Sequence, residues 1–144
     1  MRVVIASGKG GAGKTCVTAS LADVWRGPLV AVDTDAEAPN LHLFLPPRIT
    51  ETTTAYLDVP NMDPEKCIHC EKCRNICTYK AIASFAGRIT LFPDMCHGCG
   101  GCFEVCPEGA LEEGRRELGV LSTGLIPGQI PYIMGTTRVG EVMT

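Results

Sequence analysis

Two blocks of cysteines are the residues of this chain whose type and spacing most clearly indicate chemistry. They read Cys67-x2-Cys70-x2-Cys73-x3-Cys77 and Cys96-x2-Cys99-x2-Cys102-x3-Cys106. Cysteines this closely spaced cannot readily cross-link to one another, but their thiolates can converge on one inorganic centre. Corresponding cysteines are 29 residues apart (96 − 67 = 29), and the same offset relates Ile82 to Leu111. The pattern indicates a duplicated unit.

The cysteine spacing resembles that of bacterial two-cluster ferredoxins, in which three close cysteines bind one 4Fe-4S cluster and the fourth serves the other. The resemblance implies one cluster on Cys67, Cys70, Cys73 and Cys106 and a second on Cys96, Cys99, Cys102 and Cys77. Cys106-Pro107 matches the ferredoxin pattern, whereas Cys77-Thr78 lacks the proline. Structural zinc is the alternative, but zinc sites prefer two separated cysteine pairs, so the spacing favours iron and sulfur.

A glycine-rich loop near the N-terminus is the second candidate site. It reads Gly8-Lys9-Gly10-Gly11-Ala12-Gly13-Lys14-Thr15. The pattern Gly-x4-Gly-Lys-Thr is typical of a phosphate-binding loop, whose backbone N–H groups point at phosphate oxygens. In such a loop Lys14 neutralises the β- and γ-phosphates and Thr15 binds Mg²⁺. We therefore predict an ATP and Mg²⁺ site here, the alternative being a glycine-rich turn that binds nothing.

The loop and a later acidic segment resemble two motifs of the MinD, Mrp and ParA class of P-loop ATPases. The segment reads Asp33-Thr34-Asp35-Ala36-Glu37-Ala38-Pro39-Asn40. The resemblance implies that Lys9 reaches the nucleotide of a dimer partner, that Asp33 supports Mg²⁺, and that Asp35 orients the attacking water. Lys14, Asp35 and Lys9 are thus the candidate catalytic residues. The alternatives are a solvated charge at Lys9 and aspartates that cap a strand end.

Strand, helix and strand are expected around the loop. Arg2–Ser7 and Leu29–Val32 are apolar runs typical of buried strands. Helical spacing with one buried face relates Val17, Leu21, Val24 and Trp25. In such a unit the strands are parallel, and ligands lie at their carboxyl ends. Cys16 is interpreted as a small buried residue of this helix.

Shorter elements are expected in the rest of the chain. We predict helices over Thr78–Ser84 and Glu108–Glu113 and strands over Thr54–Val59, Gly87–Phe92 and Gly119–Thr123. The region 124–144 is rich in glycine and proline and predicts no element. The histidines within the cysteine blocks, His69 and His97, are interpreted as loop residues, because each cluster already has four thiolates.

Composition excludes several classes of function. A net charge of −3 and a pI near 5.6 argue against a nucleic-acid surface, which needs a basic excess. The apolar stretches are far shorter than the roughly 18 residues of a membrane span, and the N-terminus does not resemble a signal peptide. We therefore expect a cytoplasmic protein that binds neither nucleic acid nor a membrane.

Together the motifs resemble MinD/Mrp-type P-loop ATPases with an inserted two-cluster ferredoxin domain. The implied fold is α/β, an incomplete P-loop NTPase-type parallel sheet with an inserted α+β ferredoxin-like domain. The expected domains are a nucleotide-binding part (1–56), the insert (57–122) and a return segment (123–144) that ends before Walker B. Arg138–Glu141 resembles the family's lead-in to the missing half. The 78 residues outside the insert (144 − 66 = 78) are too few to cover a parallel sheet, which indicates a truncated or reduced chain, or one completed by a partner.

The implied function is an ATP-binding protein, acting as a homodimer or with a related P-loop subunit. Nucleotide binding would be coupled to two 4Fe-4S clusters, for electron transfer with a redox partner or for cluster delivery to an iron–sulfur client protein. ATP hydrolysis is expected of the complete protein. The alternative is a simple ferredoxin-type electron-transfer module whose P-loop half is structural or vestigial. A positioning ATPase is the least favoured interpretation, because no amphipathic C-terminal helix or basic patch is evident.

Overall fold

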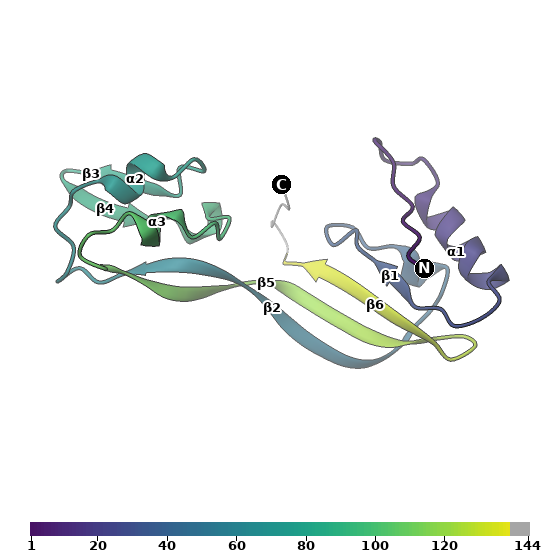
Figure 1. The fold of residues 1–144 in the computed structure, drawn as a ribbon. Helices are drawn as coiled ribbons and strands as arrows, with labels where there is room; N and C mark the ends of the chain where they lie inside the picture. The colour runs from purple at the N-terminus through teal and green to yellow at the C-terminus, as the bar shows by residue number, and fades with distance from the viewer. Residues whose placement is uncertain (139–144) are drawn as a thin grey trace. The chain divides into compact units, whose positions relative to one another are not determined.

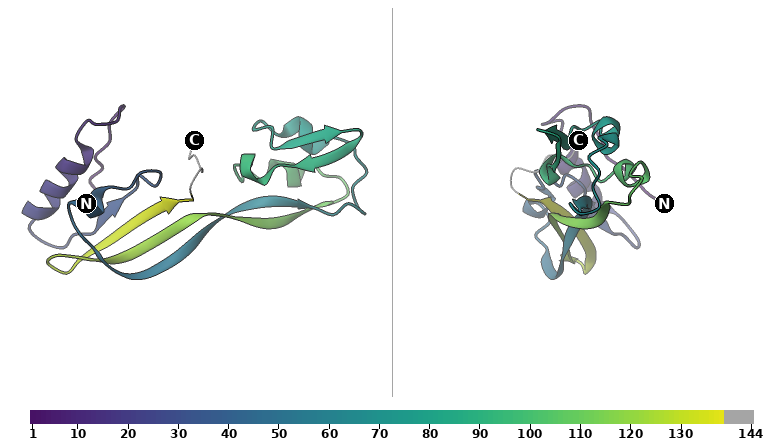
Figure 2. Two further views of the ribbon diagram at one scale, coloured as in Figure 1. Left: turned by 180° about the vertical axis from the view of Figure 1, so that it is seen from behind. Right: turned by 90° about the vertical axis from the view of Figure 1, so that its left-hand side faces the viewer.

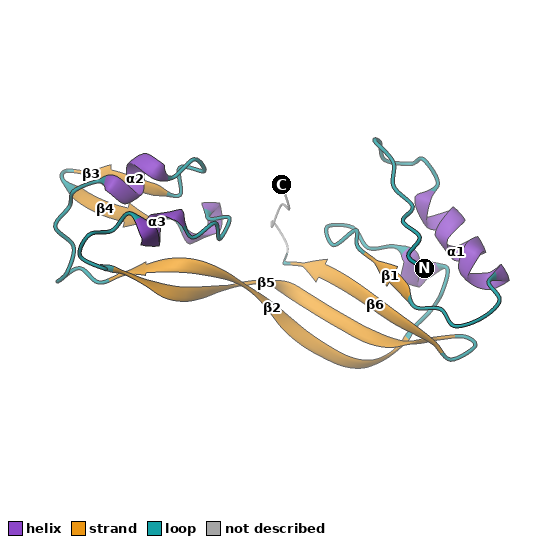
Figure 3. Ribbon diagram, viewed as in Figure 1, coloured by secondary structure: helices purple, strands orange, loops and turns teal. Residues whose placement is uncertain are grey.

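The computed structural model describes residues 1–138, in which strands predominate (Figures 1 and 3). The α-helices are α1 (Lys14–Val24), α2 (Lys72–Ile76) and α3 (Gly101–Glu104), and the 3-10 helices are η1 (Leu41–Leu43) and η2 (Pro93–Met95). The strands are β1 (Ala31–Asp33), β2 (Arg48–Met62), β3 (Ile82–Phe85), β4 (Arg88–Leu91), β5 (Leu111–Ile126) and β6 (Ile130–Thr137). Within the described residues no helix is long and apolar enough to cross a membrane.

The chain divides into two compact units. One, which we call the sheet unit, contains residues 1–55 and the described residues from Leu118 onward. The other, the cysteine unit, contains Tyr56–Glu117. Strands β2 and β5 contribute residues to both units. The cysteine unit thus contains all eight cysteines of the two blocks.

The sheet unit is built on a mixed sheet with the strand order β1-β6-β5-β2. β1 pairs with β6 in parallel, with Ala31 opposite Tyr132, whereas β5 and β6 form an antiparallel hairpin. Helix α1 packs on the core that β1 also lines, and the left view of Figure 2 shows the two elements near each other. The core between them consists of Ala19, Ala31, Leu41, Ile126 and Tyr132. Burial of these side chains holds α1, β1 and the hairpin together.

This sheet corrects the predicted fold class. The expected parallel sheet of P-loop NTPase type is not formed, because the strand predicted at Arg2–Ser7 is absent and β1 has β6 as its parallel neighbour. Val3 and Val4 are instead 55% and 84% exposed. An apolar run becomes a strand only where a neighbouring strand satisfies its backbone groups, and among the described residues none pairs with this one. The other neighbour of β6, strand β5, pairs with it in the antiparallel orientation.

Two further predictions about α1 are wrong. The face expected to be buried includes Val17 and Val24, which are 55% and 61% exposed, and the helix instead buries Ala19 and Ala22. Cys16 is exposed rather than buried. Alanine allows the helix to approach β1 closely, and the larger valines on the other positions remain at the surface.

The C-terminal part of the chain is more ordered than its composition predicts. The predicted strand Gly119–Thr123 is one part of the longer β5, and β6 forms in a region for which no element was expected. Gly128 and Gln129 have φ values of 83° and 60°, so the glycine-rich stretch forms the turn of the β5–β6 hairpin. The remaining residues of the predicted return segment, 139–144, lie outside the described residues, as does most of the expected lead-in to Walker B.

The cysteine unit shows the duplicated architecture in its helices. Adding 29 to the bounds of α2 gives 101 and 105, and α3 spans Gly101–Glu104. The two helices contact each other, and β3 and β4 form an antiparallel hairpin with Phe85 opposite Arg88. Its two turn residues, Ala86 and Gly87, both have positive φ, as a two-residue type I′ turn requires. The predicted strand Gly87–Phe92 is confirmed as β4.

The helices predicted after each cysteine block are wrong. Residues Ile82–Phe85 form strand β3, and β5 begins at Leu111, 29 residues beyond Ile82. Short apolar runs suit a strand or a helix equally well, and here hairpin pairing with β4 decides for a strand. The predicted strand Thr54–Val59 lies within β2.

The buried Tyr132 hydroxyl leads to a prediction about the sheet unit. The residue is 0% exposed, and its hydroxyl has no hydrogen-bond partner among residues 1–138. Burial, and to a lesser extent the charge of Asp33, raises its pKa from 10 to about 12. Because the neutral phenol is favoured in the folded state, the free energy of unfolding has its full value below pH 10 and declines as the pH rises toward 12. Tyr132→Phe should cost less than about 1 kcal/mol at pH 7 and should retain its stability between pH 10 and 12. Urea denaturation at both pH values tests this, and a parallel decline of the variant with the wild type would contradict it.

Candidate metal centre

Two pockets in the cysteine unit bring together the eight cysteines of the two blocks. The first, pocket one, is lined by Cys67, Cys70, Cys73 and Cys106. The second, pocket two, is lined by Cys77, Cys96, Cys99 and Cys102. Each pocket thus receives three cysteines from one block and the last cysteine from the other. This is the grouping that the ferredoxin-like spacing implies.

The third cysteine of each block is part of the core of the unit. Cys73 and Cys102 are buried and pack together with Ile82, Ile89 and Leu111. Burial raises the pKa of both thiols above the ordinary value, and neighbouring cysteines raise it further: Cys106 and Cys67 for Cys73, and Cys96 and Cys99 for Cys102. Since a metal ligand is a thiolate, these two positions need the positive charge of a metal to ionise at neutral pH.

The backbone around the two pockets repeats with the same 29-residue offset. His69, Glu71 and Lys80 have φ values of 54°, 61° and 57°, and their counterparts Gly98, Gly100 and Gly109 have φ values of 65°, 75° and 56°. The two blocks therefore follow the same left-handed turns. The second repeat uses glycine at each turn, whereas the first uses side-chain-bearing residues, which adopt this conformation less readily.

Lys80 allows this conformational cost to be tested. Lys80→Gly should leave the free energy of unfolding unchanged or raise it by up to about 1 kcal/mol, because the left-handed strain of lysine offsets the extra chain entropy of glycine. The matched control is Lys72→Gly within α2, which should lower stability by about 1 kcal/mol. Thermal denaturation of the protein with intact metal centres measures both. A larger loss at Lys80 than at Lys72 would refute the strain argument.

Backbone N–H groups, and in pocket one also a histidine ring nitrogen, lie near the sulfur atoms of the two pockets. The N–H of Gly98 donates to Cys96 Sγ at 3.4 Å, and in pocket one His69 Nδ1 lies 3.7 Å from Cys67 Sγ. His97 stacks on Tyr79 beside pocket two, with ring centroids 4.0 Å apart. The histidines were expected to be loop residues, and both lie in the pocket linings. Hydrogen bonds to ligand sulfur are one means by which a protein tunes a cluster.

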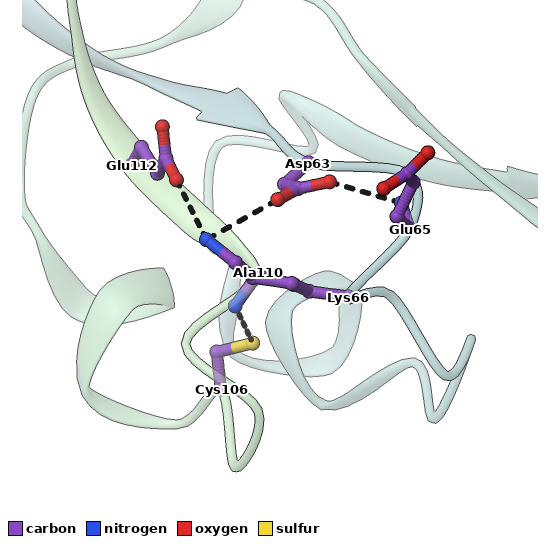
Figure 4. Close-up of polar contacts among 6 residues, drawn as sticks. All are labelled: Asp63, Glu65, Lys66, Cys106, Ala110 and Glu112. Carbon is purple, nitrogen blue, oxygen red and sulfur yellow. Dashed lines mark hydrogen bonds and ion pairs between the residues drawn. The ribbon is translucent and has the colours of Figure 1, made fainter.

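A small polar network holds the segment just before Cys67 (Figure 4). Lys66 Nζ lies 2.9 Å from Glu112 Oε1 and 3.2 Å from Asp63 Oδ2, and these contacts raise the pKa of Lys66. The backbone N–H of Asp63 donates to the carbonyl of Ala110, and the backbone N–H of Ala110 donates to Cys106 Sγ at 3.3 Å. These bonds connect the start of the first repeat to the segment that carries Cys106, the cysteine of the second block that lines pocket one.

Arg116 is a residue that the motif analysis missed. Its side chain is 7% exposed, and its guanidinium donates to the carbonyl of Cys96 at 3.5 Å and lies 4.0 Å from Asp94 Oδ1. Among the described residues of the cysteine unit, Arg116 is the only charged residue that is buried. The repeat offset aligns it with Gly87 (116 − 29 = 87), so the first repeat has no counterpart. The neighbouring Arg115 aligns with Ala86 and is unmatched as well (115 − 29 = 86), so no sequence signal singles out Arg116.

The donor chemistry of the two pockets fits iron–sulfur clusters. Four thiols line each pocket, and cysteine thiolate is the ligand that 4Fe-4S clusters require. Within residues 1–138, no three His, Cys, Asp or Glu side chains are close enough to hold a single metal ion. The residues that would hold the clusters are the eight cysteines, and a bound cluster supplies one-electron redox chemistry.

The second candidate site has a different arrangement. Lys14 Nζ donates to Ser7 Oγ at 3.2 Å, ahead of α1, and the Thr15 hydroxyl donates to the side chain of Asn40. Asp33 accepts hydrogen bonds from the backbone N–H groups of Asp35, Asn40 and Leu41. The structure therefore connects Thr15 with Asp33 through Asn40. Asp33 acts here on the local backbone, which is the strand-end role named among the alternatives. Among residues 1–138 the side chains of Lys9 and Asp35 make no hydrogen bond or ion pair, and their catalytic roles stay predictions.

Comparison with known proteins agrees with the cysteine pockets. Residues 61–112 match the family model described as a 4Fe-4S dicluster domain. The pyruvate synthase subunit PorD of Methanocaldococcus jannaschii is 37% identical over 59 residues, which are 40% of this chain and 69% of that subunit. The indolepyruvate oxidoreductase subunit IorA of Methanothermobacter marburgensis is 41% identical over 56 residues, which are 38% of this chain and 9% of that subunit.

A longer relative matches nearly the whole chain. An uncharacterized protein of Methanocaldococcus jannaschii is 34% identical over 144 residues, which cover 98% of this chain and 50% of that protein. A second uncharacterized protein of the same organism is 28% identical and is covered to 49%. The chain therefore spans about half the length of the curated relatives that it matches from end to end.

These comparisons correct the proposed relationship to MinD, Mrp and ParA. No family of P-loop ATPases matches the chain, whereas a 4Fe-4S dicluster domain does. The expected homodimer, ATP and Mg²⁺ depended on that resemblance, and the comparisons do not support them. The iron–sulfur part of the prediction agrees with the match, as does the alternative of a ferredoxin-type module. The chain belongs to the 4Fe-4S dicluster domain family, which it matches through residues 61–112.

Proposed function

We propose that the chain is an electron-transfer module that carries two 4Fe-4S clusters, one in pocket one and one in pocket two. The observation that supports it most strongly is the crossed grouping of the cysteines, three from one block and the fourth from the other in each pocket. Two clusters held by one small unit allow an electron to pass between them without a second protein. Four cysteine ligands from two blocks hold each cluster firmly, which suits electron transfer better than cluster donation, because donation needs a labile cluster.

The relatives support a redox partner as the source or destination of the electrons. PorD is named as a subunit of pyruvate synthase and IorA as a subunit of indolepyruvate oxidoreductase. We propose by analogy that the module exchanges single electrons with an oxidoreductase subunit. Among the cluster ligands, Cys70 and Cys99 are exposed, so both pockets are accessible from the surface of the cysteine unit.

Anaerobic reconstitution of the full chain with iron and sulfide tests this function. The expected product holds about eight iron atoms, as two four-iron clusters require, and shows EPR signals of reduced clusters after treatment with dithionite. A parallel reconstitution with zinc provides the comparison for the zinc alternative. If the protein binds zinc stoichiometrically and fails to assemble clusters, the proposed function is wrong.

We propose separately that the loop 8–15 binds the phosphates of a nucleotide. The proposal is supported by the positive φ values of Gly11 and Gly13, and by the contacts of Lys14 and Thr15 at the start of α1. Calorimetry with MgATP is the test, with Lys14→Ala as the variant that should lose the heat of binding. Absence of binding by the wild-type chain would leave the loop a structural turn.

A further inference from the structure

The charges around the two pockets are unequal. Pocket one is lined by Glu71 and Glu108 and pocket two by Asp58, and neither described lining contains a lysine or arginine. Glu71 is paired with Arg74 at 3.1 Å, and both side chains are partly exposed. Glu108 thus leaves a negative charge at pocket one. On the opposite repeat, the carbonyl of a pocket-two cysteine, Cys96, accepts a hydrogen bond from a guanidinium.

The guanidinium at pocket two belongs to Arg116, whose side chain is 7% exposed. Its acidic neighbour Asp94 is 79% exposed and 4.0 Å away, so water and salt weaken the compensation that Asp94 provides. The carboxylate in the lining of pocket two, Asp58, lies 3.8 Å from Arg115. A buried positive charge therefore lies beside pocket two, on the carbonyl of Cys96, and the carboxylate 4.0 Å from it is solvated.

A buried charge near a redox centre changes the free energy of its two oxidation states unequally. Adding an electron makes the centre more negative, so a nearby cation stabilises the reduced state. Burial matters because the interaction of exposed charges is screened by water and by salt. Arg115, the preceding residue on β5, is 75% exposed and should have a much weaker effect. Glu108 acts in the opposite direction at pocket one.

We propose that Arg116 makes the cluster of pocket two the better electron acceptor of the pair, so that a chain carrying one electron carries it there. The proposal rests on the proposed electron-transfer function, and it identifies the residue that determines which of the two clusters is reduced first. The electron comes from an external one-electron donor, and its arrival reduces one cluster while the donor is oxidised. Arg116 acts through the charge of its guanidinium, which stabilises the reduced cluster, and it is not a ligand of iron.

A redox titration of the anaerobically reconstituted full chain, followed by EPR, tests the proposal. Arg116→Gln keeps a hydrogen-bond donor for the carbonyl of Cys96 but removes the charge. At a fixed potential, the ratio of reduced to oxidised cluster should fall at least threefold for one couple. That shift is about 28 mV, since a tenfold change corresponds to 59 mV for one electron. The couple that moves should be the one lost from Cys99→Ala protein.

Two further variants separate charge from structure. Arg116→Lys keeps the charge and should restore the potential, and Arg115→Gln removes an exposed charge and should leave both couples in place. If Arg116→Gln protein holds fewer than about eight iron atoms, Arg116→Met is titrated instead under the same criteria. Unmoved couples in a variant with full iron content, or equal shifts in the Arg115 variant, overturn the proposal. Failure of the wild type to assemble two clusters would instead disprove the proposed function.

Discussion

Cys106→Ala is expected to abolish the same iron–sulfur signal as Cys70→Ala, although Cys106 lies in the other cysteine block. The reason is that both cysteines line pocket one, whereas the remaining cysteines of the second block line pocket two. Loss of one ligand should reduce the iron content from about eight to about four atoms per chain. In the same way, Cys77→Ala should reproduce the spectrum of Cys99→Ala. Iron analysis and EPR of the four variants measure this.

The chain provides its own control for these substitutions. Cys16 is the ninth cysteine, lies outside both blocks and is exposed on α1. Cys16→Ala should leave iron content and spectra unchanged, which excludes a general effect of thiol removal. If Cys106→Ala instead matched Cys99→Ala, each block would serve its own cluster, and the crossed assignment would be refuted.

Removal of iron should unfold the cysteine unit and leave the sheet unit folded. The hydrophobic core cluster of the cysteine unit consists of five buried residues, and two of them are the cysteines Cys73 and Cys102. A unit of this size has too little apolar core to be stable alone, so the free energy of cluster binding becomes free energy of folding. Chelation under anaerobic conditions should therefore lower amide protection in α2 and α3 at least tenfold, a change of about 1.4 kcal/mol.

The sheet unit supplies the internal reference for that experiment. Its core contains the fully buried Tyr132 and none of the eight block cysteines. Amides of β6 should keep their protection when iron is removed, and α2 and α3 should regain theirs when iron and sulfide return. Unchanged protection in α2 and α3 after complete loss of iron would contradict the prediction.

The sequence predicted more of the cysteine site than of the fold. Ligand spacing is a local property, and a 29-residue repeat is visible without knowledge of tertiary structure. The repeat also extends to features that no motif describes, such as the left-handed turns shared by Glu71 and Gly100. Arg116 could not be identified because a single buried charge has no spacing signature, and the repeat does not distinguish it from the exposed Arg115.

The sheet could not be predicted because strand pairing depends on distant segments. The run Arg2–Ser7 has the composition of a buried strand, yet no described strand pairs with it. The strand predicted at Leu29–Val32 overlaps the observed strand β1, but the parallel partner of β1 is β6, about 100 residues further along the chain. A phosphate-loop motif is informative only in its structural context of strand and helix. Here the expected strand before the loop is absent, and the matching family model covers residues 61–112, outside the loop.

The crossed grouping of the cysteines has a consequence for the timing of synthesis. On the proposed ligation, the cluster of pocket two is complete only when Cys102 has been made, and that of pocket one only when Cys106 has been made. The two final ligands are four residues apart (106 − 102 = 4), although the first ligand, Cys67, precedes them by more than thirty. A ribosome adds about 5–20 residues per second, so both centres become assembly-competent within about one second of each other. A growing chain that ends anywhere before Cys102 presents only unfinished sites to iron.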